Sequence, residues 1–293
     1  MKITEGYMPY LGYKTYYRIV GENTGDKKPL LLLHGGPGST HNYFEVLDDV
    51  AKDGRAVIMY DQIGCGLSST PSRPDLWTPE VWVDELVALR EHLNLDEVHI
   101  LGQSWGGMLA IQYAVNRKPK GVKSYIMSST LPSAAIWEKE QRRRITYLPQ
   151  DMQDAIAEAE RTNDYSSEEY QRAEAAFMLR YTAGEITEDS PECLRRDKVA
   201  GTEAYLTAWG QNEFSPSGTL KDFDFTEEIK DIETPSLVMS GLVDLCSPLI
   251  AKTLYDNLPN SEWELFEYSR HMPFVEENEK YIGVLNEWLN KND

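Results

Sequence analysis

Short apolar runs alternate with amphipathic segments along the first 130 residues of the chain. The runs at 29–33, 56–60 and 98–101 are almost wholly apolar, which is typical of strands buried on both faces of a parallel sheet. Between them, residues 43–50 place apolar side chains at helical spacing, and Pro79 opens a second helix. Strands that alternate with helices predict an α/β fold with a doubly wound, mostly parallel central sheet.

The pattern changes after residue 130. Residues 131–226 carry helical patterns without a strong strand, and the α/β pattern returns with apolar runs at 236–240 and 263–266. The sequence therefore predicts an α/β core formed by residues 1–130 and 227–293. A helical cap, residues 131–226, is inserted into that core.

A glycine-rich turn separates the apolar run at 98–101 from the helix that follows. It reads Gly-Gln-Ser-Trp-Gly, residues 102–106, and matches the G-x-S-x-G turn called the nucleophile elbow. Such a turn holds a serine on a strained backbone, with close backbone neighbours on both sides. Ser104 is the candidate nucleophile, although a plain Gly-Ser turn between a strand and a helix would read the same way.

A serine hydroxyl needs a base, most often a histidine held by a carboxylate. His271 follows the run at 263–266, which is the place of the base if the chain order is serine, acid, histidine. We expect His92 and His99 to lie on the surface. His41 falls early in a helix, and His34 falls in a loop with another use.

The acid should follow a strand between Ser104 and His271. Asp244 lies three residues after Gly241, at the carboxyl end of the run at 236–240. Asp231 and Glu233 precede that run and would lie at the wrong edge of the sheet. Asp244 is therefore the candidate acid, with a simple turn aspartate as the alternative.

Two backbone N–H groups are needed to hold the oxyanion of acyl transfer. One should belong to Trp105, the residue after the nucleophile. The loop His-Gly-Gly-Pro-Gly, residues 34–38, follows the first buried run and is suited to supply the other, for which Gly36 is the candidate.

Composition excludes several classes of function. The formal net charge of −19 disfavours nucleic acid and anionic membranes as partners, and no apolar run is long enough for a transmembrane helix. The three cysteines are widely separated, without metal-ligand spacing or a disulfide framework, and they favour a cytoplasmic protein. We expect no metal and no cofactor, since no phosphate-binding loop is present either.

Five segments together resemble a known family. HGGPG, YDQIGCGLS, GQSWGG, VDLCSP and RHMPF are similar to segments of the prolyl aminopeptidases (proline iminopeptidases) of the α/β-hydrolase fold, most of all those of lactic-acid bacteria. The resemblance implies release of N-terminal proline from short peptides by Ser104, Asp244 and His271. It also implies an acidic cap residue that holds the free amino terminus of the substrate, and the segment WGQNEF places it at Glu213.

Two features bear on the substrate. Some relatives have a glutamate directly after the catalytic aspartate, where this chain has Leu245, so a second carboxylate is missing or comes from elsewhere. The proline ring needs a small apolar pocket, and its candidate residues are equally suited to the core of the cap: Trp105, Tyr205, Trp209 and Phe214.

These observations predict a serine exopeptidase acting through a prolyl-enzyme intermediate on small peptides with a free N-terminal proline. Three alternatives use the same scaffold: a Pro-X dipeptidase (prolinase), an amino-acid amidase and an esterase. A non-enzymatic ligand-binding protein is disfavoured by the complete set of catalytic candidates.

Overall fold

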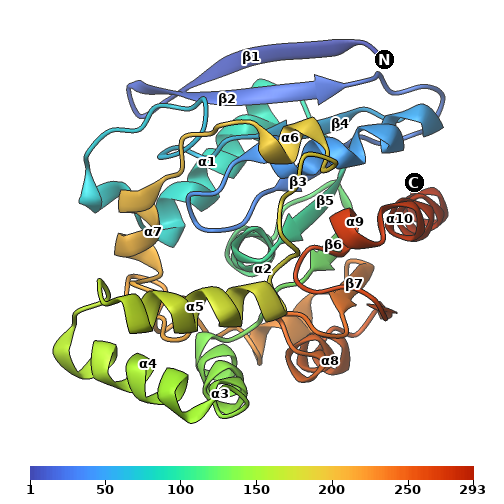
Figure 1. The fold of residues 1–293 in the computed structure, drawn as a ribbon. Coiled ribbons are helices and arrows are strands. Elements are labelled where there is room, and N and C mark those ends of the chain that lie inside the picture. The colour runs from blue at the N-terminus through green and yellow to red at the C-terminus, as the bar shows by residue number, and fades with distance from the viewer.

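Eight strands form one sheet in the order β1-β2-β4-β3-β5-β6-β7-β8 (Figure 1). The structure is a computed structural model that describes residues 1–293. Strands β3 to β8 pair in parallel, whereas β1 and β2 are antiparallel. This confirms the predicted α/β fold with a mostly parallel sheet. The strands are β1 (Ile3–Tyr10), β2 (Tyr13–Val20), β3 (Leu30–Leu33), β4 (Val57–Tyr60), β5 (Val98–Gln103), β6 (Val122–Ser128), β7 (Ser236–Gly241) and β8 (Ser261–Phe266).

Strand β1 was not predicted from the hydrophobic pattern. It forms the edge of the sheet and most of its residues are exposed, so its sequence shows little apolar alternation. Pro9 is compatible with an edge position, where its missing N–H costs no ladder hydrogen bond. A two-residue turn, Leu11 and Gly12, joins β1 to β2. Both residues adopt positive φ, 49° and 81°, which is typical of the tight turns of β-hairpins.

Helices cover both faces of the sheet, and alternate residues of the strands contribute to two separate cores. Leu30 and Leu32 pack with the helices η1 and α10, whereas Leu31 and Leu33 pack with α1, α2 and α8 on the other face. This two-residue period explains why the parallel strands are apolar throughout. The core helices are the 3₁₀ helix η1 (His41–Asp53), α1 (Pro79–His92), α2 (Trp105–Arg117), α8 (Pro248–Asn257), α9 (Pro273–Glu276) and α10 (Asn278–Asn292).

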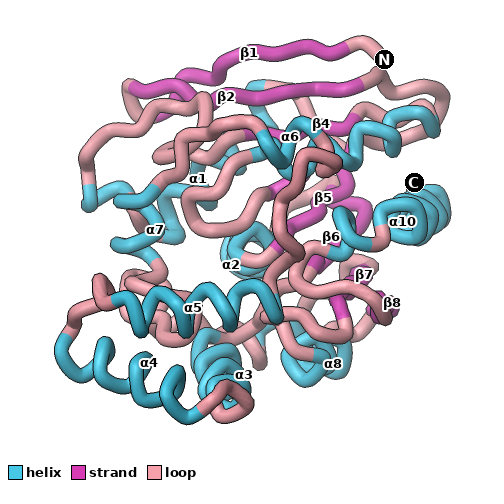
Figure 2. Tube along the Cα trace, viewed as in Figure 1, coloured by secondary structure: helices cyan, strands magenta, loops and turns pink.

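The segment between β6 and β7 contains five α-helices, the short 3₁₀ helix η3 (Glu228–Asp231) and no strand of the sheet. Helices α3, α4 and α5 lie together at the lower left in Figure 1, and a long loop then returns past the core to α6, as Figure 2 shows. Helix α6 contacts η1, so this part of the insert lies against the core. The division into core and cap at residues 131 and 226 stays a prediction. The five helices are α3 (Ala134–Ile145), α4 (Gln150–Thr162), α5 (Glu168–Tyr181), α6 (Glu192–Arg195) and α7 (Thr202–Ala208).

The predicted surface location of His99 is wrong. His99 lies in β5, which has neighbours on both sides and helices on both faces, and its side chain is fully buried. Its Nδ1 lies 2.7 Å from Ser124 Oγ, and burial lowers its pKa to about 4, so the imidazole is neutral at pH 7. His92, at the end of α1, is exposed as expected. No helix has both the length and the apolar character that a membrane crossing requires.

A buried carboxyl group supports the loop after β4. Glu85, on α1, accepts hydrogen bonds from Ile63 N at 2.9 and 3.1 Å and from the Thr15 hydroxyl. It is fully buried, and this desolvation raises its pKa to about 8. The group is therefore mostly protonated in the folded protein at pH 7.

Replacement of Glu85 by Gln should flatten the pH dependence of stability. Between about pH 5 and 8 the folded wild type holds a proton that the unfolded chain releases, so Glu85 makes stability fall as the pH rises. The free energy of unfolding of E85Q should therefore gain on the wild type by up to about 1.4 kcal/mol for each pH unit. Urea unfolding at pH 5.5, 7.0 and 8.5 measures the difference. Glu91→Gln changes an exposed carboxylate on the same helix, and its free energy of unfolding should differ from that of the wild type by the same amount at each pH. If the difference between E85Q and the wild type were also the same at each pH, the prediction would be contradicted.

Candidate active site

Ser104 stands between the end of β5 and the start of α2 on a strained backbone, with φ 55° and ψ −124°. Glycines on both sides make this conformation possible. A Cβ at Gly106 would collide with the carbonyl oxygen of Leu33, and one at Gly102 would collide with the backbone of Gly106. The Ser104 carbonyl accepts hydrogen bonds from Gly107 N at 2.9 Å and Thr130 Oγ1 at 2.6 Å, which fixes the turn.

Asp244 and His271 form a buried pair at the ends of β7 and β8. The Asp244 Oδ1 atom lies 2.6 Å from His271 Nδ1. The carboxylate is fully buried and also accepts hydrogen bonds from Gly241 N at 3.1 Å and Cys246 N at 2.8 Å. These backbone donors fix the orientation of the carboxylate, and the carboxylate in turn orients the imidazole so that Nε2 is available as a base.

Ser104 and His271 line the same cavity of about 460 Å³. No hydrogen bond joins the Ser104 hydroxyl to the imidazole, and such bonds in active sites commonly tighten only when substrate binds. His271 is the only one of the five histidines that lines this cavity. The structure therefore brings together the three residues that chain order selected as nucleophile, acid and base.

The backbone N–H groups of Gly36 and Trp105 flank the nucleophile without partners. Neither donates a hydrogen bond within the protein, and both residues line a small cavity beside Ser104. Gly36 has φ 112°, in the region that favours glycine, and a Cβ there would approach Gly38 N and Ser39 N to 2.6 Å. Two unpaired donors beside a serine can hold an oxyanion.

A polar chain missed in the sequence connects the loop of Gly36 to His271. Gly35 N donates to the Tyr43 hydroxyl at 2.5 Å, and that hydroxyl donates to Gln103 Oε1 at 2.9 Å. Gln103 Nε2 then donates to the carbonyl of His271 at 3.3 Å. Tyr43 and Gln103 are both buried. One signal in the sequence could have indicated this chain. Gln103 is a polar residue between Gly102 and Ser104, in a turn where the neighbouring glycines pack against backbone atoms.

His34 also fixes this loop, through hydrogen bonds to Gln62. Its Nε2 accepts a hydrogen bond from Gln62 N at 3.0 Å, and the Gln62 side chain donates to the His34 carbonyl at 3.0 Å. Burial lowers the pKa of His34 to about 4, so the ring is neutral and able to accept. Gln62 Oε1 also accepts from Trp105 Nε1 at 2.7 Å, which joins the two candidate oxyanion segments through one side chain.

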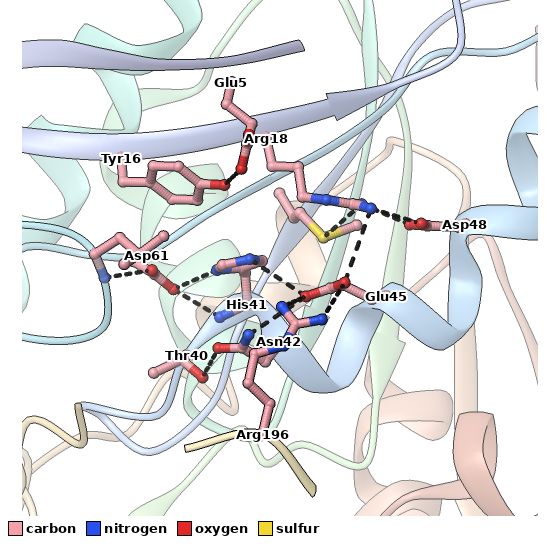
Figure 3. A network of polar contacts seen from close by, with 12 residues as sticks. Glu5, Tyr16, Arg18, Thr40, His41, Asn42, Glu45, Asp48, Asp61 and Arg196 are labelled. Carbon is pink, nitrogen blue, oxygen red and sulfur yellow. Dashed lines mark hydrogen bonds and ion pairs between the residues drawn. The ribbon is translucent and has the colours of Figure 1, made fainter. Parts of the chain in front are cut away.

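Residues that closely follow this loop in the chain, among them His41, belong to a charged network (Figure 3). Asp61 is fully buried and accepts hydrogen bonds from the backbone N and the Nδ1 of His41 at 2.7 and 2.8 Å. Gly66 packs so closely on this carboxylate that any Cβ would collide with it, which explains the glycine in the segment YDQIGCG. Glu45, on η1, accepts from Arg196 of the insert at 2.9 Å. The network thus ties the insert to the core beside the site.

Glu213 lines the main cavity together with Ser104. Its Oε1 accepts a hydrogen bond from the Tyr205 hydroxyl at 2.8 Å, and its carbonyl accepts one from Trp137 Nε1 at 2.7 Å. No lysine or arginine pairs with it, and burial raises the pKa of its carboxyl group. The nearby carboxylate of Glu174, on α5, raises the pKa further. Glu174 is a second acidic group that the sequence did not suggest.

The candidate ring-pocket residues occupy different places. Trp105 and Trp209 line the small cavity of about 10 Å³ beside Ser104 and Glu213, and Trp137, which the sequence did not single out, completes its wall. Tyr205 lines the larger cavity. Phe214 lines neither, because it packs in the core against Phe177, with ring centroids 4.8 Å apart. No group of three or more His, Cys, Asp or Glu residues is arranged to hold a metal ion.

We compared the sequence and the structure of the chain with those of known proteins. A family model described as alpha/beta hydrolase fold matches residues 28–278. The chain is 78% identical to a proline iminopeptidase of Clostridium botulinum and 54% identical to one of Lactobacillus helveticus, each over the full length of both chains. The Lactobacillus protein is thus the less similar of the two. The crystal structure of a proline iminopeptidase from Mycobacterium smegmatis superposes with a TM-score of 0.87, at 29% identity, over 99% of this chain and 98% of that one.

Removal of the Tyr43 hydroxyl should weaken both the fold and the site. In Y43F the buried Gly35 N–H and Gln103 Oε1 lose their partner, so the free energy of unfolding should fall by about 1–3 kcal/mol. The loop of Gly36 also loses its link to His271, and kcat should fall roughly tenfold with little change in KM. Y60F is the matched control. The Tyr60 hydroxyl is buried without a hydrogen-bond partner, so its removal should lower neither the free energy of unfolding nor kcat. Equal losses in the two variants would contradict this account.

Proposed function

Because the chain belongs to the α/β-hydrolase family and, within it, to the proline iminopeptidases, we propose that Ser104, Asp244 and His271 release N-terminal proline from small peptides. The chain is a hydrolase with prolyl aminopeptidase activity. The observation that supports the residue assignment is that one cavity is lined by a strained serine, a histidine held by a buried aspartate, and an unpaired carboxylate.

Acylation begins with attack of Ser104 Oγ on the carbonyl carbon of the N-terminal proline. His271 Nε2 takes the hydroxyl proton, and Asp244 balances the charge of the imidazolium. The carbonyl oxygen becomes an oxyanion held by the N–H groups of Gly36 and Trp105. When the C–N bond breaks, His271 gives its proton to the leaving amine and the shortened peptide departs, which leaves a prolyl ester on Ser104.

Deacylation repeats the cycle with water. His271 removes a proton from water as the oxygen attacks the ester carbon, and the same two N–H groups hold the second oxyanion. Collapse of this intermediate returns the proton from His271 to Ser104 Oγ and releases proline. Every group in the two half-reactions belongs to the chain, to the peptide or to water.

Glu213 binds the charged amino terminus of the substrate. A prolinium group presents two N–H donors, and a carboxylate shielded from water pairs strongly with such a group. Oε1 of Glu213 is already oriented by Tyr205, so Oε2 is available for the substrate. Glu174 adds negative potential at Glu213, although it does not line the cavity, and would offset in part the Leu245 position where some relatives have a glutamate.

This arrangement makes the enzyme an exopeptidase. When the amino terminus is acylated or extended by a further residue, the proline nitrogen becomes an uncharged amide without an N–H group. It would leave the Glu213 carboxylate buried without a partner, which disfavours binding. The ring of proline would lie in the cavity of about 460 Å³ beside Tyr205 and Leu206, because the space of about 10 Å³ beside Trp105 and Trp209 holds no more than a water molecule. We also propose a cytoplasmic location, which the three free cysteines support.

Replacement of Ser104 by Ala should abolish turnover. The variant keeps the fold but lacks the nucleophile, so kcat on prolyl p-nitroanilide should fall by roughly 10⁴-fold or more. Circular dichroism and thermal unfolding verify that the variant is folded. Retention of prolyl hydrolysis by a folded S104A enzyme would refute the assignment of the nucleophile.

Glu213→Gln should remove the preference for a free amino terminus. We expect kcat/KM on prolyl p-nitroanilide to fall by roughly 10²-fold, while the slow rate on the N-acetylated substrate stays unchanged. Glu169→Gln, which alters an exposed carboxylate on α5, is the matched control and should behave as the wild type. An esterase would hydrolyse both substrates at similar rates before and after the mutation, and that result would overturn the aminopeptidase assignment.

A further inference from the structure

Three consecutive arginines on α3 differ sharply in their surroundings. Arg142 and Arg143 keep 39% and 50% of their side-chain surface exposed and pair with Glu160 and Glu140. Arg144 retains only 4% exposure and forms no ion pair with any carboxylate. A buried cation without such a pair is costly, so its position calls for another physical reason.

The guanidinium of Arg144 lies against the loop of the catalytic acid. Its Nη1 donates to the carbonyl of Leu245 at 3.0 Å, and its Cζ atom lies over the ring of Tyr181, 4.5 Å from the ring centroid. Gln141, one turn earlier on α3, donates to the same carbonyl at 2.9 Å. Leu245 directly follows Asp244, so two side chains of the insert fix the peptide next to the catalytic carboxylate.

The opposite side of this loop is held by the end of α5. Leu245 N donates to the carbonyl of Tyr181 at 3.1 Å, and His271 N donates to the carbonyl of Thr182 at 3.0 Å. The ring of Tyr181 that stacks on Arg144 therefore belongs to the same helix end that fixes the backbone of the base. Arg144 lies at the junction of α3, α5 and the acid loop.

The groups that interact electrostatically with Arg144 come from three parts of the chain. They are Asp244 and Cys246 of the acid loop, Tyr181 of α5 and Glu140 of α3. Asp244 contributes most among them, so the attraction between the guanidinium and the Asp244 carboxylate adds to the hydrogen bond that holds the acid loop against α3.

We propose that Arg144 is a positioning residue of the active site, which holds the Leu245 carbonyl and so fixes the backbone next to Asp244 and, through Asp244, the orientation of His271. The role rests on the proposed function of that pair. It differs from ordinary packing, because a packing role predicts changes in stability alone, whereas this role predicts a fall in kcat at unchanged KM that a hydrogen-bonding substitute at position 144 restores in part.

The experiment compares Arg144→Met and Arg144→Lys with the wild type on prolyl p-nitroanilide at pH 7. In R144M, kcat should fall roughly tenfold with KM changed less than about twofold, since Arg144 does not line the cavity. R144K can still donate a hydrogen bond to the Leu245 carbonyl but lacks the planar guanidinium, so it should recover part of the lost kcat, to within about threefold of the wild type, with KM again unchanged.

Arg180→Met is the matched control. Arg180 lies over the same Tyr181 ring, at 5.5 Å, but it is exposed and does not bond the acid loop. R180M should match the wild type in kcat and KM. If R144M does not fold, Gln141→Met decides, because it removes the other donor to the same carbonyl and should lower kcat several-fold with KM unchanged.

The outcomes separate this inference from the proposed function. A folded R144M enzyme with the kcat of the wild type overturns the role of Arg144, and so does a fall in kcat that R144K does not reduce. Should R144M be unfolded, a folded Q141M enzyme with the kcat of the wild type overturns it as well. Absence of prolyl hydrolysis in the wild type would instead refute the proposed function, whatever the variants do.

Discussion

Close contact between backbones at the end of β3 and the start of α2 is the constraint on which the site depends. The Leu33 carbonyl lies where the side chain of any other residue at position 106 would have to go. This contact places the strained Ser104 turn beside the loop of Gly36, so the nucleophile and the two unpaired N–H groups share one small region. The geometry is built into the strand order, since β3 and β5 are neighbours in the sheet. Little reorganisation is then needed when an oxyanion forms, which is the condition for strong electrostatic stabilisation.

Sequence patterns predicted the sheet and the catalytic candidates for a physical reason. Parallel strands end at one edge, so Ser104, Asp244 and His271, each placed after an apolar run, had to meet there. What the pattern could not predict depended on neighbours that are distant in the chain. His99 is buried because β5 lies between two strands, and β1 was missed because an edge strand shows little apolar alternation. Phe214 and Glu213 are adjacent, yet one faces the core and the other faces the cavity.

The insert takes part in the construction of the site. The carbonyls at the end of α5 accept hydrogen bonds from the backbones of Leu245 and His271, and Gly201 N donates to Gly38 O at 2.7 Å beside the loop of Gly36. Residues of the insert also supply the polar and apolar walls of the cavity. In the proposed mechanism, selection of the substrate and orientation of the base are therefore linked through the same helices. The buried Gln141 and Arg144 of α3 contribute to this link, because both donate to the Leu245 carbonyl.

The account is tested most directly by covalent labelling with the diphenyl phosphonate analogue of proline, followed by peptide mapping. A free prolyl phosphonate should modify Ser104 stoichiometrically and no other residue, because the hydroxyl, the unpaired N–H groups and the Glu213 carboxylate act on the same molecule. The N-acetylated reagent should react far more slowly. Labelling at a residue other than Ser104, or equal rates for the free and acetylated reagents, would contradict the account.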